Sequence, residues 1–366
     1  MVEEKKEDEK MAKFKIGCIG VGGIAKWLQI PGTIKSPDLE LVALCDIDQE
    51  VLDAAAKEYA ICKSRCFTDY NDLLNCNEVD AVCIATPNDT HFPMAMAAVK
   101  AGKPYLLEKP TTLNGQEADE LAEATIKHDI KNMVNLSKRF ISAARYARDL
   151  VQSGKLGQIY HIDVQYFHSW ALPSKEVGFI WRFDKNQSGP GGCLSDLGSH
   201  CIDYIRFITG EEFVNVVGRA DTIVKERPRL EGGMGKVEVD DYCIFHAGLS
   251  GGASAIIHVS NVAYGRNDYQ RVEIYGSEGS LIYQNNAGDG RGGELEICIG
   301  EEYANGRIFT KLPIPGQYES DQMQSFADIL NDCGDGLAAT IIDGQINQHV
   351  LDKVLISLQT KAWIDI

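Results

Sequence analysis

A short apolar run that ends in a glycine-rich turn is the feature that most constrains the fold of this chain. Residues 14–20 form the apolar run, and Gly20-Val21-Gly22-Gly23-Ile24-Ala25 leads from it into a helical pattern. In this G-x-G-x-x-A pattern, Gly20 allows a tight turn and Gly22 lets the backbone approach a pyrophosphate, which rests on free N–H groups at the helix start. Without its context, the same string also fits a glycine-rich turn that binds no ligand.

The region from Phe14 to Leu136 alternates short apolar runs with helical periodicity, which is typical of a doubly wound parallel sheet. Several runs are nearly continuous, as expected for strands that helices cover on both faces. The expected strands are Phe14–Gly20, Leu39–Cys45, Val79–Ala85, Pro104–Glu108 and Asn132–Leu136. The expected helices are Gln49–Tyr59, His91–Ala101 and Gly115–His128. The sequence therefore predicts a Rossmann domain in this half of the chain.

After about Phe140 the pattern changes to long alternating segments with Gly and Asn at the turns. Strands at this spacing, without helices between them, indicate a largely antiparallel open sheet. The expected strands are Ile159–Tyr166, Val214–Val224, Val239–Leu249, Ala253–Val262, Tyr269–Tyr275 and Gly279–Tyr283. The expected helices are Ala143–Ser153, Asp196–Ile208, Gln322–Leu330 and Gln345–Gln359. We therefore predict an α/β chain with a Rossmann doubly wound parallel sheet followed by an α+β domain.

The predicted division is a disordered charged tail at 1–12, a nucleotide-binding domain at 13–136 and a domain for substrate binding and oligomerisation at 137–366. A length of 366 residues fits about two domains at the usual ~100–200 residues each. The net charge of -17 repels phosphate backbones and anionic lipid, so we expect neither nucleic acid nor a membrane as a partner. The charged N-terminus also lacks the apolar region of a signal peptide.

The 11 cysteines are scattered through the sequence, many of them inside apolar runs, where cysteine usually acts as a small buried hydrophobe. No Cys-x-x-Cys pair or Cys/His cluster appears, so we expect no metal site. Reduced thiols fit a cytoplasmic protein.

An acidic residue at the end of the second expected strand extends the nucleotide-binding pattern. Asp46 follows Cys45, where a carboxylate can accept hydrogen bonds from a ribose 2′-hydroxyl and would repel a 2′-phosphate. With Asp48 close by and no Lys or Arg before Lys57, the sequence favours NAD over NADP. The alternative interpretation is that Asp46 only caps a helix or a turn.

Residues at the carboxyl ends of the other strands are further candidate cofactor contacts, because ligands of such sheets lie at that edge. The loop from Thr86 to His91 is well placed to line the cofactor, although Asn88 or Thr90 could simply cap the helix that follows. The predicted cofactor-binding residues are Gly20, Gly22, Gly23, Ile24, Ala25, Asp46, Thr86, Asn88, His91, Glu108, Lys109 and Asn135.

The segment Glu108-Lys109-Pro110 places two opposite charges at the end of an apolar strand. Proline disfavours helical geometry in the residue before it, so the backbone of Lys109 is held extended and its side-chain direction is constrained. We expect an unusual Lys109–Pro110 peptide, with cis as the candidate geometry, that aims the lysine at the ligand edge of the sheet. The alternative is a Glu-Lys pair exposed to solvent.

A second constellation lies in the segment from Gly189 to Asp203, which reads GPGGCLSDLGSHCID. Asp196 and His200 are four residues apart and Asp203 follows three residues later, so all three are expected on one helical face. The preceding glycines let a flat ring approach the backbone. The alternative is a charge at a helix N-terminus beside a core histidine.

Three segments in this order resemble the glucose-fructose oxidoreductase, inositol dehydrogenase and rhizopine-catabolism (Gfo/Idh/MocA) family: GVGGIA, EKP and GGCLSDLGSHCID. The resemblance covers residues 13–366. It implies that the lysine of E-K-P and the Asp and His of D-x-x-x-H form the catalytic centre, here Lys109, Asp196 and His200. It also implies NAD(P), a nicotinamide over the second-domain sheet, and homodimers or homotetramers joined through that sheet.

The segment around Trp181 looks like the branch of this family that oxidises pyranosides or cyclitols, including glycoside 3-dehydrogenases. We therefore expect hydride transfer between NAD+ and a ring secondary alcohol, for example C3 of a glucoside or a hydroxyl-bearing carbon of myo-inositol. Trp170 and Trp181 could equally be core residues. The predicted substrate-binding residues are Lys109, His168, Trp170, Trp181, Arg182, Asp196 and His200.

The residues leave the general base open between two groups. His200 tuned by Asp196 is one, because imidazole titrates near neutral pH, and Lys109 would then stabilise alkoxide charge. Lys109 with a pKa lowered by burial and by the NAD+ charge is the other. Two other classes also stay open: an NAD-dependent glycosidase acting by transient oxidation, and a non-enzymatic NAD-binding regulatory subunit.

Overall fold

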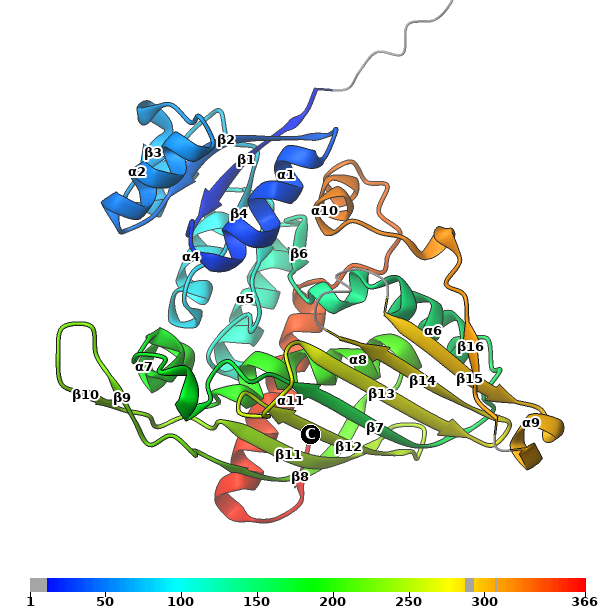
Figure 1. The fold of residues 1–366 in the computed structure, drawn as a ribbon. Helices are drawn as coiled ribbons and strands as arrows, with labels where there is room; N and C mark the ends of the chain where they lie inside the picture. Colours follow the sequence, from blue (N-terminus) through cyan, green and yellow to red (C-terminus); the bar gives the residue numbers. More distant parts are fainter. Residues whose placement is uncertain (1–11, 287–292, 307) are drawn as a thin grey trace, which may run out of the picture.

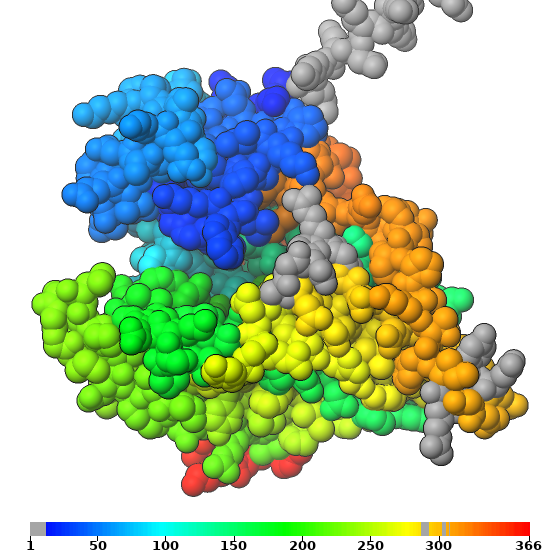
Figure 2. All heavy atoms as spheres, viewed as in Figure 1, coloured from blue at the N-terminus to red at the C-terminus, as the bar shows by residue number. Residues whose placement is uncertain are grey.

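The computed structural model describes residues 12–286, 293–306 and 308–366, so residues 1–11 of the expected tail lie outside it. The described residues form two large sheets, each with helices packed against it, and a third sheet of two strands (Figure 1). In Figure 2 the first domain, coloured blue to cyan, lies against the green and yellow part of the second. No helix among the described residues is long and apolar enough to cross a membrane.

Within the described residues, the first sheet has six parallel strands in the order β3-β2-β1-β4-β5-β6. The strands are β1 (Phe14–Ile19), β2 (Leu39–Cys45), β3 (Cys66–Phe67), β4 (Ala81–Ile84), β5 (Tyr105–Leu107) and β6 (Asn132–Val134). The strand order reverses between β1 and β4, which is where such sheets bind ligands. The expected doubly wound parallel sheet is confirmed, and the short strand β3 is an addition to it.

Two apolar cores cover the faces of this sheet, because alternate residues of a strand point to opposite sides. The covering helices are α1 (Ile30–Lys35), α2 (Gln49–Glu58), α3 (Tyr70–Leu74), α4 (His91–Lys100), α5 (Gly115–Lys127) and α10 (Gln322–Leu330). On β4, Val82 and Ile84 belong to the core of α3, α4 and α5. Its neighbour Cys83 belongs to the core of α1, α2 and α10.

The segment that contains α10 returns from the end of the chain to the first domain, where Figure 1 shows it in orange beside α1. Phe326 is fully buried in the same core as Cys83. Further along, the N–H of Val134 donates to the carbonyl of Ala339 at 2.8 Å, which ties residue 339 to β6. The expected boundary near residue 137 is therefore a boundary in sequence, while residues 322–341 complete the first domain in space.

Within the described residues, the second sheet has nine strands in the order β16-β15-β14-β13-β7-β12-β11-β8-β17. Neighbours are antiparallel except the parallel pair β7 and β12, so the expected largely antiparallel sheet is confirmed. The strands are β7 (Ile159–Phe167), β8 (Phe213–Asp221), β11 (Tyr242–Leu249), β12 (Ser254–Ser260), β13 (Tyr269–Gly276), β14 (Gly279–Asn285), β15 (Glu294–Ile299), β16 (Thr310–Leu312) and β17 (Ile364–Asp365).

One face of this sheet packs on α6 (Ser142–Gln152), α8 (Ser199–Thr209) and α11 (Ile341–Thr360), which share its apolar core. A separate two-stranded hairpin, formed by residues 226–236, extends from the domain (Figure 1). The remaining elements are β9 (Glu226–Pro228), β10 (Met234–Lys236), α7 (Lys185–Ser188), α9 (Glu301–Gly306), the 3-10 helices η2 (Lys63–Arg65), η3 (Asn88–Thr90), η4 (Ser137–Phe140), η5 (Pro173–Lys175), η6 (Trp181–Phe183) and η8 (Gly316–Tyr318), and the π-helices η1 (Ala25–Gln29) and η7 (Leu194–Gly198).

The structure shortens two expected strands of the second sheet. The strand expected at Val214–Val224 ends at Asp221, and the one expected from Val239 begins at Tyr242. The reason is the side chain of Asp241, whose Oδ2 accepts the N–H groups of Ile223 and Val224 at 2.7 and 2.8 Å. These backbone groups therefore bond a carboxylate and leave the sheet, which alternating hydrophobicity could not indicate.

Candidate active site

The lysine of the Glu-Lys-Pro segment reaches across to the second domain. Its Nζ donates hydrogen bonds to Oδ1 of Asp196 at 2.6 Å and to the carbonyl oxygen of the same residue at 2.8 Å. The side chain of Lys109 is only 14% exposed, and the Lys109–Pro110 peptide is cis. The expected cis geometry is thus confirmed, and the lysine is engaged in the protein and does not extend into solvent.

The carboxylate of Asp196 contacts two cations. Besides Lys109, the Nη1 atom of Arg182 lies 3.1 Å from Oδ1 of Asp196. Burial by itself opposes ionisation of this carboxyl, but Arg182 and Lys109 hold its pKa well below the usual range. Asp196 is therefore ionised at neutral pH, and it holds both cations in place.

A partly buried aspartate, Asp240, fixes the segment that carries Asp196. Asp240 accepts the N–H of Gly192 through Oδ1 and the N–H of Leu194 through Oδ2, both at 2.8 Å. A Cβ atom at Gly192 would lie 2.5 Å from the carbonyl oxygen of Asp240, so only glycine allows this approach. Burial raises the pKa of Asp240 to about 6. This aspartate was not predicted as a site residue.

His200 is the second residue of α8, which follows directly on the π-helix that contains Asp196. It is buried, its Nδ1 has no hydrogen-bond partner among the described residues, and its ring centroid lies 5.9 Å from that of Tyr166. Burial, followed by the charges of Lys109 and Lys138, lowers the pKa of His200 well below its usual value. The imidazole is therefore neutral at physiological pH and can accept a proton.

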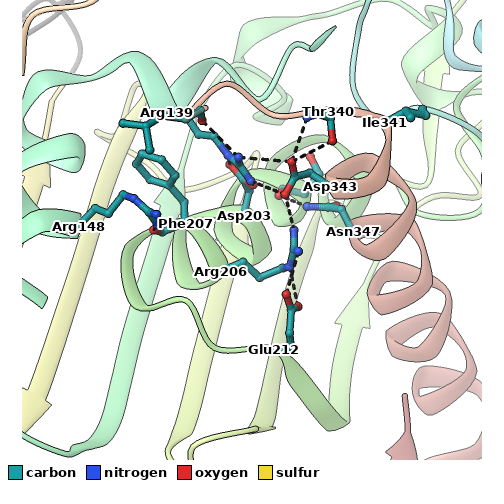
Figure 3. A network of polar contacts seen from close by, with 12 residues as sticks. Arg139, Arg148, Asp203, Arg206, Phe207, Glu212, Thr340, Ile341, Asp343 and Asn347 are labelled. Carbon is teal, nitrogen blue, oxygen red and sulfur yellow. Dashed lines mark hydrogen bonds and ion pairs between the residues drawn. The ribbon is translucent and has the colours of Figure 1, made fainter. Parts of the chain in front are cut away.

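Asp203 was expected on the same helical face as Asp196 and His200, and in the structure its carboxylate bonds Arg139. Its Oδ1 accepts from Nη2 of Arg139 at 2.6 Å, in a buried network that also contains Asp343 and Arg206 (Figure 3). The π-helix η7 lies between Asp196 and α8, so the spacing of 3.6 residues does not hold between Asp196 and Asp203. The network joins η4, α8 and α11, and so it anchors the helix that carries His200.

The glycine turn has room for a pyrophosphate. Gly20 has φ +82°, and a Cβ there would lie 2.5 Å from the carbonyl oxygen of Ala85, so the turn requires glycine. A Cβ at Gly22 or Gly23 would meet no atom within 4 Å, which leaves open space at the start of the helix. The first N–H groups of a helix lack partners within it, so this turn fits an anionic phosphate. Ile24 and Ala25 begin the helical segment that follows.

Asp46 borders the same turn. Its Oδ2 accepts the N–H of Val21 at 3.0 Å, and its Oδ1 accepts the N–H of Asp48 at 3.0 Å. The side chain remains partly exposed beyond these two bonds. Both interpretations of Asp46 are therefore compatible with the structure: it closes a turn, and it presents a carboxylate beside the open glycine segment.

The loop after β4 connects the two domains. Nδ2 of Asn88 donates to the carbonyl of Ser188 in the second domain at 2.9 Å, and the hydroxyl of Thr90 donates to that of Thr86 at 2.7 Å. His91 is buried, with Nδ1 at 2.7 Å from the carbonyl oxygen of Pro110 and Nε2 at 3.0 Å from that of Thr86. In this structure the side chains of Asn88 and His91 therefore hold the loop in place.

Glu108 and Asn135 form a buried polar cluster with Gln29, a residue that was not predicted. The amides of Gln29 and Asn135 both donate to Oε1 of Glu108, the former at 2.8 Å. Burial raises the pKa of Glu108. Glu108 immediately precedes Lys109 in the chain, and the cluster joins the ends of β5 and β6 to the helical segment after the glycine turn.

The predicted substrate residues fall into two groups. Trp170, Trp181 and Arg182 line a small pocket together with Asp196 and Asp240. Trp170 also packs against Phe183 at 5.4 Å between ring centroids and donates from Nε1 to Asn261 at 3.0 Å, so it serves a local core as well.

His168 lies apart from that pocket, beside a cluster that the sequence did not indicate. Its Nδ1 accepts the N–H of Asp268 at 3.1 Å, and Asp268 in turn contacts Lys138 and Tyr166. Lys138 follows shortly after β6. Because ligands of such sheets lie at the carboxyl ends of the strands, its position in the sequence could have identified it as a candidate. Asp268 stands in an irregular loop with no pattern to identify it. Among the described residues, no group of three His, Cys, Asp or Glu side chains is arranged to hold a metal ion.

Two family models match the chain in succession. The model described as an oxidoreductase family with an NAD-binding Rossmann fold matches residues 14–136. The model of the GFO/IDH/MocA C-terminal domain matches residues 144–282. These ranges cover most of both domains described above.

Curated relatives and solved structures agree with these matches. Levoglucosan dehydrogenase of Pseudarthrobacter phenanthrenivorans is 26% identical over 356 residues, covering 88% of this chain and 88% of that protein. A solved levoglucosan dehydrogenase in complex with NADH has a TM-score of 0.86 and 25% identity, covering 96% of this chain and 99% of the other. Inositol 2-dehydrogenase of Rhizobium meliloti is 26% identical, with 94% and 99% covered. Glucose-6-phosphate 3-dehydrogenase of Bacillus subtilis is 28% identical, with 74% of each covered.

Proposed function

This chain belongs to the GFO/IDH/MocA family of NAD-binding oxidoreductases, and we propose that it transfers a hydride between NAD+ and a ring secondary alcohol of a sugar, glycoside or cyclitol. The observation that carries the proposal is the contact between Lys109 and Asp196, with neutral His200 one helical turn away. The names of the relatives, which include a levoglucosan, an inositol and a glucose-6-phosphate dehydrogenase, support a polyol substrate.

In this proposal the bound NAD+ supplies the redox chemistry by accepting the hydride, and the protein supplies position and a proton acceptor. The open turn at Gly22 and Gly23 would hold the pyrophosphate, and Asp46 would accept the ribose hydroxyls. Because the Asp46 carboxylate would repel a 2′-phosphate, we propose NAD in preference to NADP.

The proposed proton acceptor is His200. Its imidazole is neutral, and its Nδ1 has no hydrogen-bond partner among the described residues, so it has a lone pair that could accept the proton of the reacting hydroxyl. Lys109 would then donate a hydrogen bond to the reacting oxygen and stabilise alkoxide charge as the O–H proton leaves. The reverse assignment, with Lys109 as the base, uses the same two residues and predicts a different pH dependence.

The role proposed for Asp196 is to hold Lys109. An ionised carboxylate between Lys109 and Arg182 fixes the lysine ammonium in one position, so that it need not reorganise as charge develops on the substrate. Trp170 and Trp181 line the adjacent pocket, and an indole ring suits the apolar face of a sugar ring.

We further propose a homodimer or homotetramer that uses the second sheet. Its helices pack on one face, and the other face carries aromatic contacts such as Phe167 with His258 and with Tyr269. The proposed compartment remains the cytoplasm, because all the cysteines are free thiols.

The function is tested with a panel of inositols, free sugars and glycosides incubated with NAD+, in which NADH formation is followed by absorbance. Net NADH formation with at least one ring polyol is the expected result. Release of an aglycone without net NADH would support the glycosidase alternative. Binding of NAD+ without turnover of any panel member would support a regulatory role, and either outcome would contradict the proposal.

A further inference from the structure

A second charged cluster lies beside the proposed centre, around the carboxylate of Asp268. Its Oδ1 accepts a hydrogen bond from the hydroxyl of Tyr166 at 2.6 Å and from Nε2 of Gln270 at 2.9 Å. Nζ of Lys138 lies 3.2 Å from Oδ1 and 3.4 Å from Oδ2. These partners come from β7, β13 and η4, so three separate elements converge on one carboxylate.

The backbone holds Asp268 in an uncommon conformation. Its φ is +50°, in the left-handed region that residues other than glycine seldom adopt. Its N–H donates to Nδ1 of His168 at 3.1 Å, and this bond fixes the loop in that conformation. Such conformations cost free energy and persist where the surrounding structure determines them, which is common at ligand sites.

Tyr166 connects this cluster to the proposed centre. Its hydroxyl bonds Asp268, while its ring lies 5.4 Å from the ring of His168 and 5.9 Å from that of His200, between centroids. The charge of Lys138 also contributes to the lowered pKa of His200. Both clusters are therefore close enough to contact one small substrate.

The side chains of Lys138 and Asp268 can each form a further hydrogen bond. Among the described residues, Oδ2 of Asp268 has a single contact, the long one to Lys138, and the side chain is 34% exposed. Both hydrogen bonds of Lys138 go to the same carboxylate, although an ammonium has three protons. The pair thus presents an acceptor and a donor next to each other, which matches two neighbouring hydroxyls.

The charges around the centre also balance. The centre and the second cluster contain three cations and three carboxylates, and the imidazole of His200 is neutral. These charges are Lys109, Arg182 and Lys138 against Asp196, Asp240 and Asp268. Lys109 and Arg182 share Asp196, Lys138 contacts Asp268, and Asp240 bonds backbone N–H groups. A phosphate or carboxylate on the substrate would find no unpaired cation in this set, and it would meet the exposed edge of Asp268.

We propose that Lys138 and Asp268 form a specificity site that binds two neighbouring hydroxyls of an uncharged sugar or cyclitol and selects against phosphorylated or acidic sugars. This inference rests on the proposed function, and it adds the substrate class and the residues that select it. Nζ of Lys138 donates a hydrogen bond to the oxygen of one hydroxyl, and Oδ2 of Asp268 accepts a hydrogen bond from the other hydroxyl.

The first test uses Asp268→Asn and Lys138→Met in the full chain, with the neutral polyol that performs best among myo-inositol, D-glucose and methyl glucosides. Asparagine tolerates positive φ, so the loop conformation is retained. We expect KM to rise about 10- to 100-fold in each variant, the range for a lost hydrogen bond to a charged group, with a smaller change in kcat. The dissociation constant of NADH, measured by fluorescence, stays within twofold of wild type and shows that the variants are folded.

A matched control is Asp332→Asn. Asp332 also pairs with a lysine, Lys131, at 2.7 Å and also has a positive φ of 59°, but it lies at the opposite end of the first sheet from the glycine turn. This variant keeps the KM of wild type. If Asp268→Asn and Asp332→Asn share the same KM for the polyol, the specificity site is wrong.

The second test compares D-glucose with D-glucose 6-phosphate. Wild type favours the neutral sugar in kcat/KM, and Asp268→Asn, which leaves Lys138 unpaired, moves the ratio at least tenfold toward the phosphate. A wild-type preference for the phosphate, or an unchanged ratio in the variant, overturns the inference while leaving the proposed function intact. Failure of wild type to reduce NAD+ with any polyol contradicts the proposed function itself.

Discussion

Nζ of Lys109 and Oδ1 of Asp196 lie 2.6 Å apart, although 87 positions separate the two residues in the sequence. Lys109 follows β5 of the Rossmann sheet by two residues, and Asp196 belongs to a π-helix of the second domain. The ion pair therefore joins the two domains at the carboxyl edge of the first sheet. This is where a dinucleotide-binding fold places its ligand, and the predictions below follow from that arrangement.

Replacement of the two proposed catalytic groups should separate chemistry from cofactor binding. Lys109→Met and His200→Asn are each expected to lower kcat by about 100- to 10,000-fold, the usual contribution of a positioned acid or base. Neither residue contacts the glycine turn, so the dissociation constant of NADH should change little. Steady-state rates with the best polyol and fluorescence titration of NADH check both parts, and Asp332→Asn serves as the control. Wild-type turnover in both variants would exclude the proposed centre.

Asp46 should determine the choice of cofactor. Asp46→Asn keeps an oxygen that can accept the N–H of Val21 but removes the charge that would repel a 2′-phosphate. The ratio of kcat/KM for NAD+ to that for NADP+ should fall by about tenfold or more, which corresponds to about 1.4 kcal/mol. An unchanged ratio would leave Asp46 as a turn residue only.

The buried histidine His91 should make the fold sensitive to acid. Burial lowers its pKa to about 4, compared with about 6.5 in the unfolded chain. Between these values the unfolded state binds more protons than the native state, so this contribution is present above pH 6.5 and is lost as the pH falls toward 4. Wild type should therefore lose up to about 3 kcal/mol more than His91→Gln between pH 7 and pH 4. Urea denaturation at both pH values measures the difference, and equal losses would contradict the assignment.

The ion pair between Arg139 and Asp203 should contribute mainly to stability. Both side chains are buried, and Asp203→Ala leaves Arg139 with Asp343 as its one carboxylate partner among the described residues, at a cost of about 3 kcal/mol in the free energy of unfolding. Urea denaturation at pH 7 measures this cost. A variant that unfolds like wild type would show that Asp343 alone satisfies the arginine. Residual activity of the folded variant should remain far above that of Lys109→Met.

The sequence was sufficient to predict a parallel Rossmann sheet followed by a largely antiparallel sheet, and the family resemblance implied that Lys109 meets Asp196 and His200. Glycine turns, proline and strand ends have local causes, so Gly20, Lys109 and the cis Lys109–Pro110 peptide could be recognised from short segments. The return of α10 to the first domain could not, because its amphipathic pattern shows that it covers a core without showing which one.

The site residues that the sequence did not predict are positioned by tertiary contacts, and no local sequence pattern identifies them. Asp240 bonds backbone N–H groups that lie more than 40 positions away, and Asp268 stands in a loop whose conformation is set by His168. The π-helix at Leu194–Gly198 likewise breaks the regular spacing from which Asp196 and Asp203 were expected on one helical face. Each of these features is determined by partners distant in sequence, which periodicity cannot identify.

The measurement that tests the central claim most directly is transfer of label from a ring polyol deuterated at its secondary carbinol carbons. The polyol is incubated with NAD+ and the enzyme, and the reduced cofactor is analysed by mass spectrometry. The account predicts one deuterium in the NADH formed by wild type, and loss of this product in Lys109→Met despite normal NADH binding. Unlabelled NADH from wild type, or equal label transfer in the variant, would contradict it.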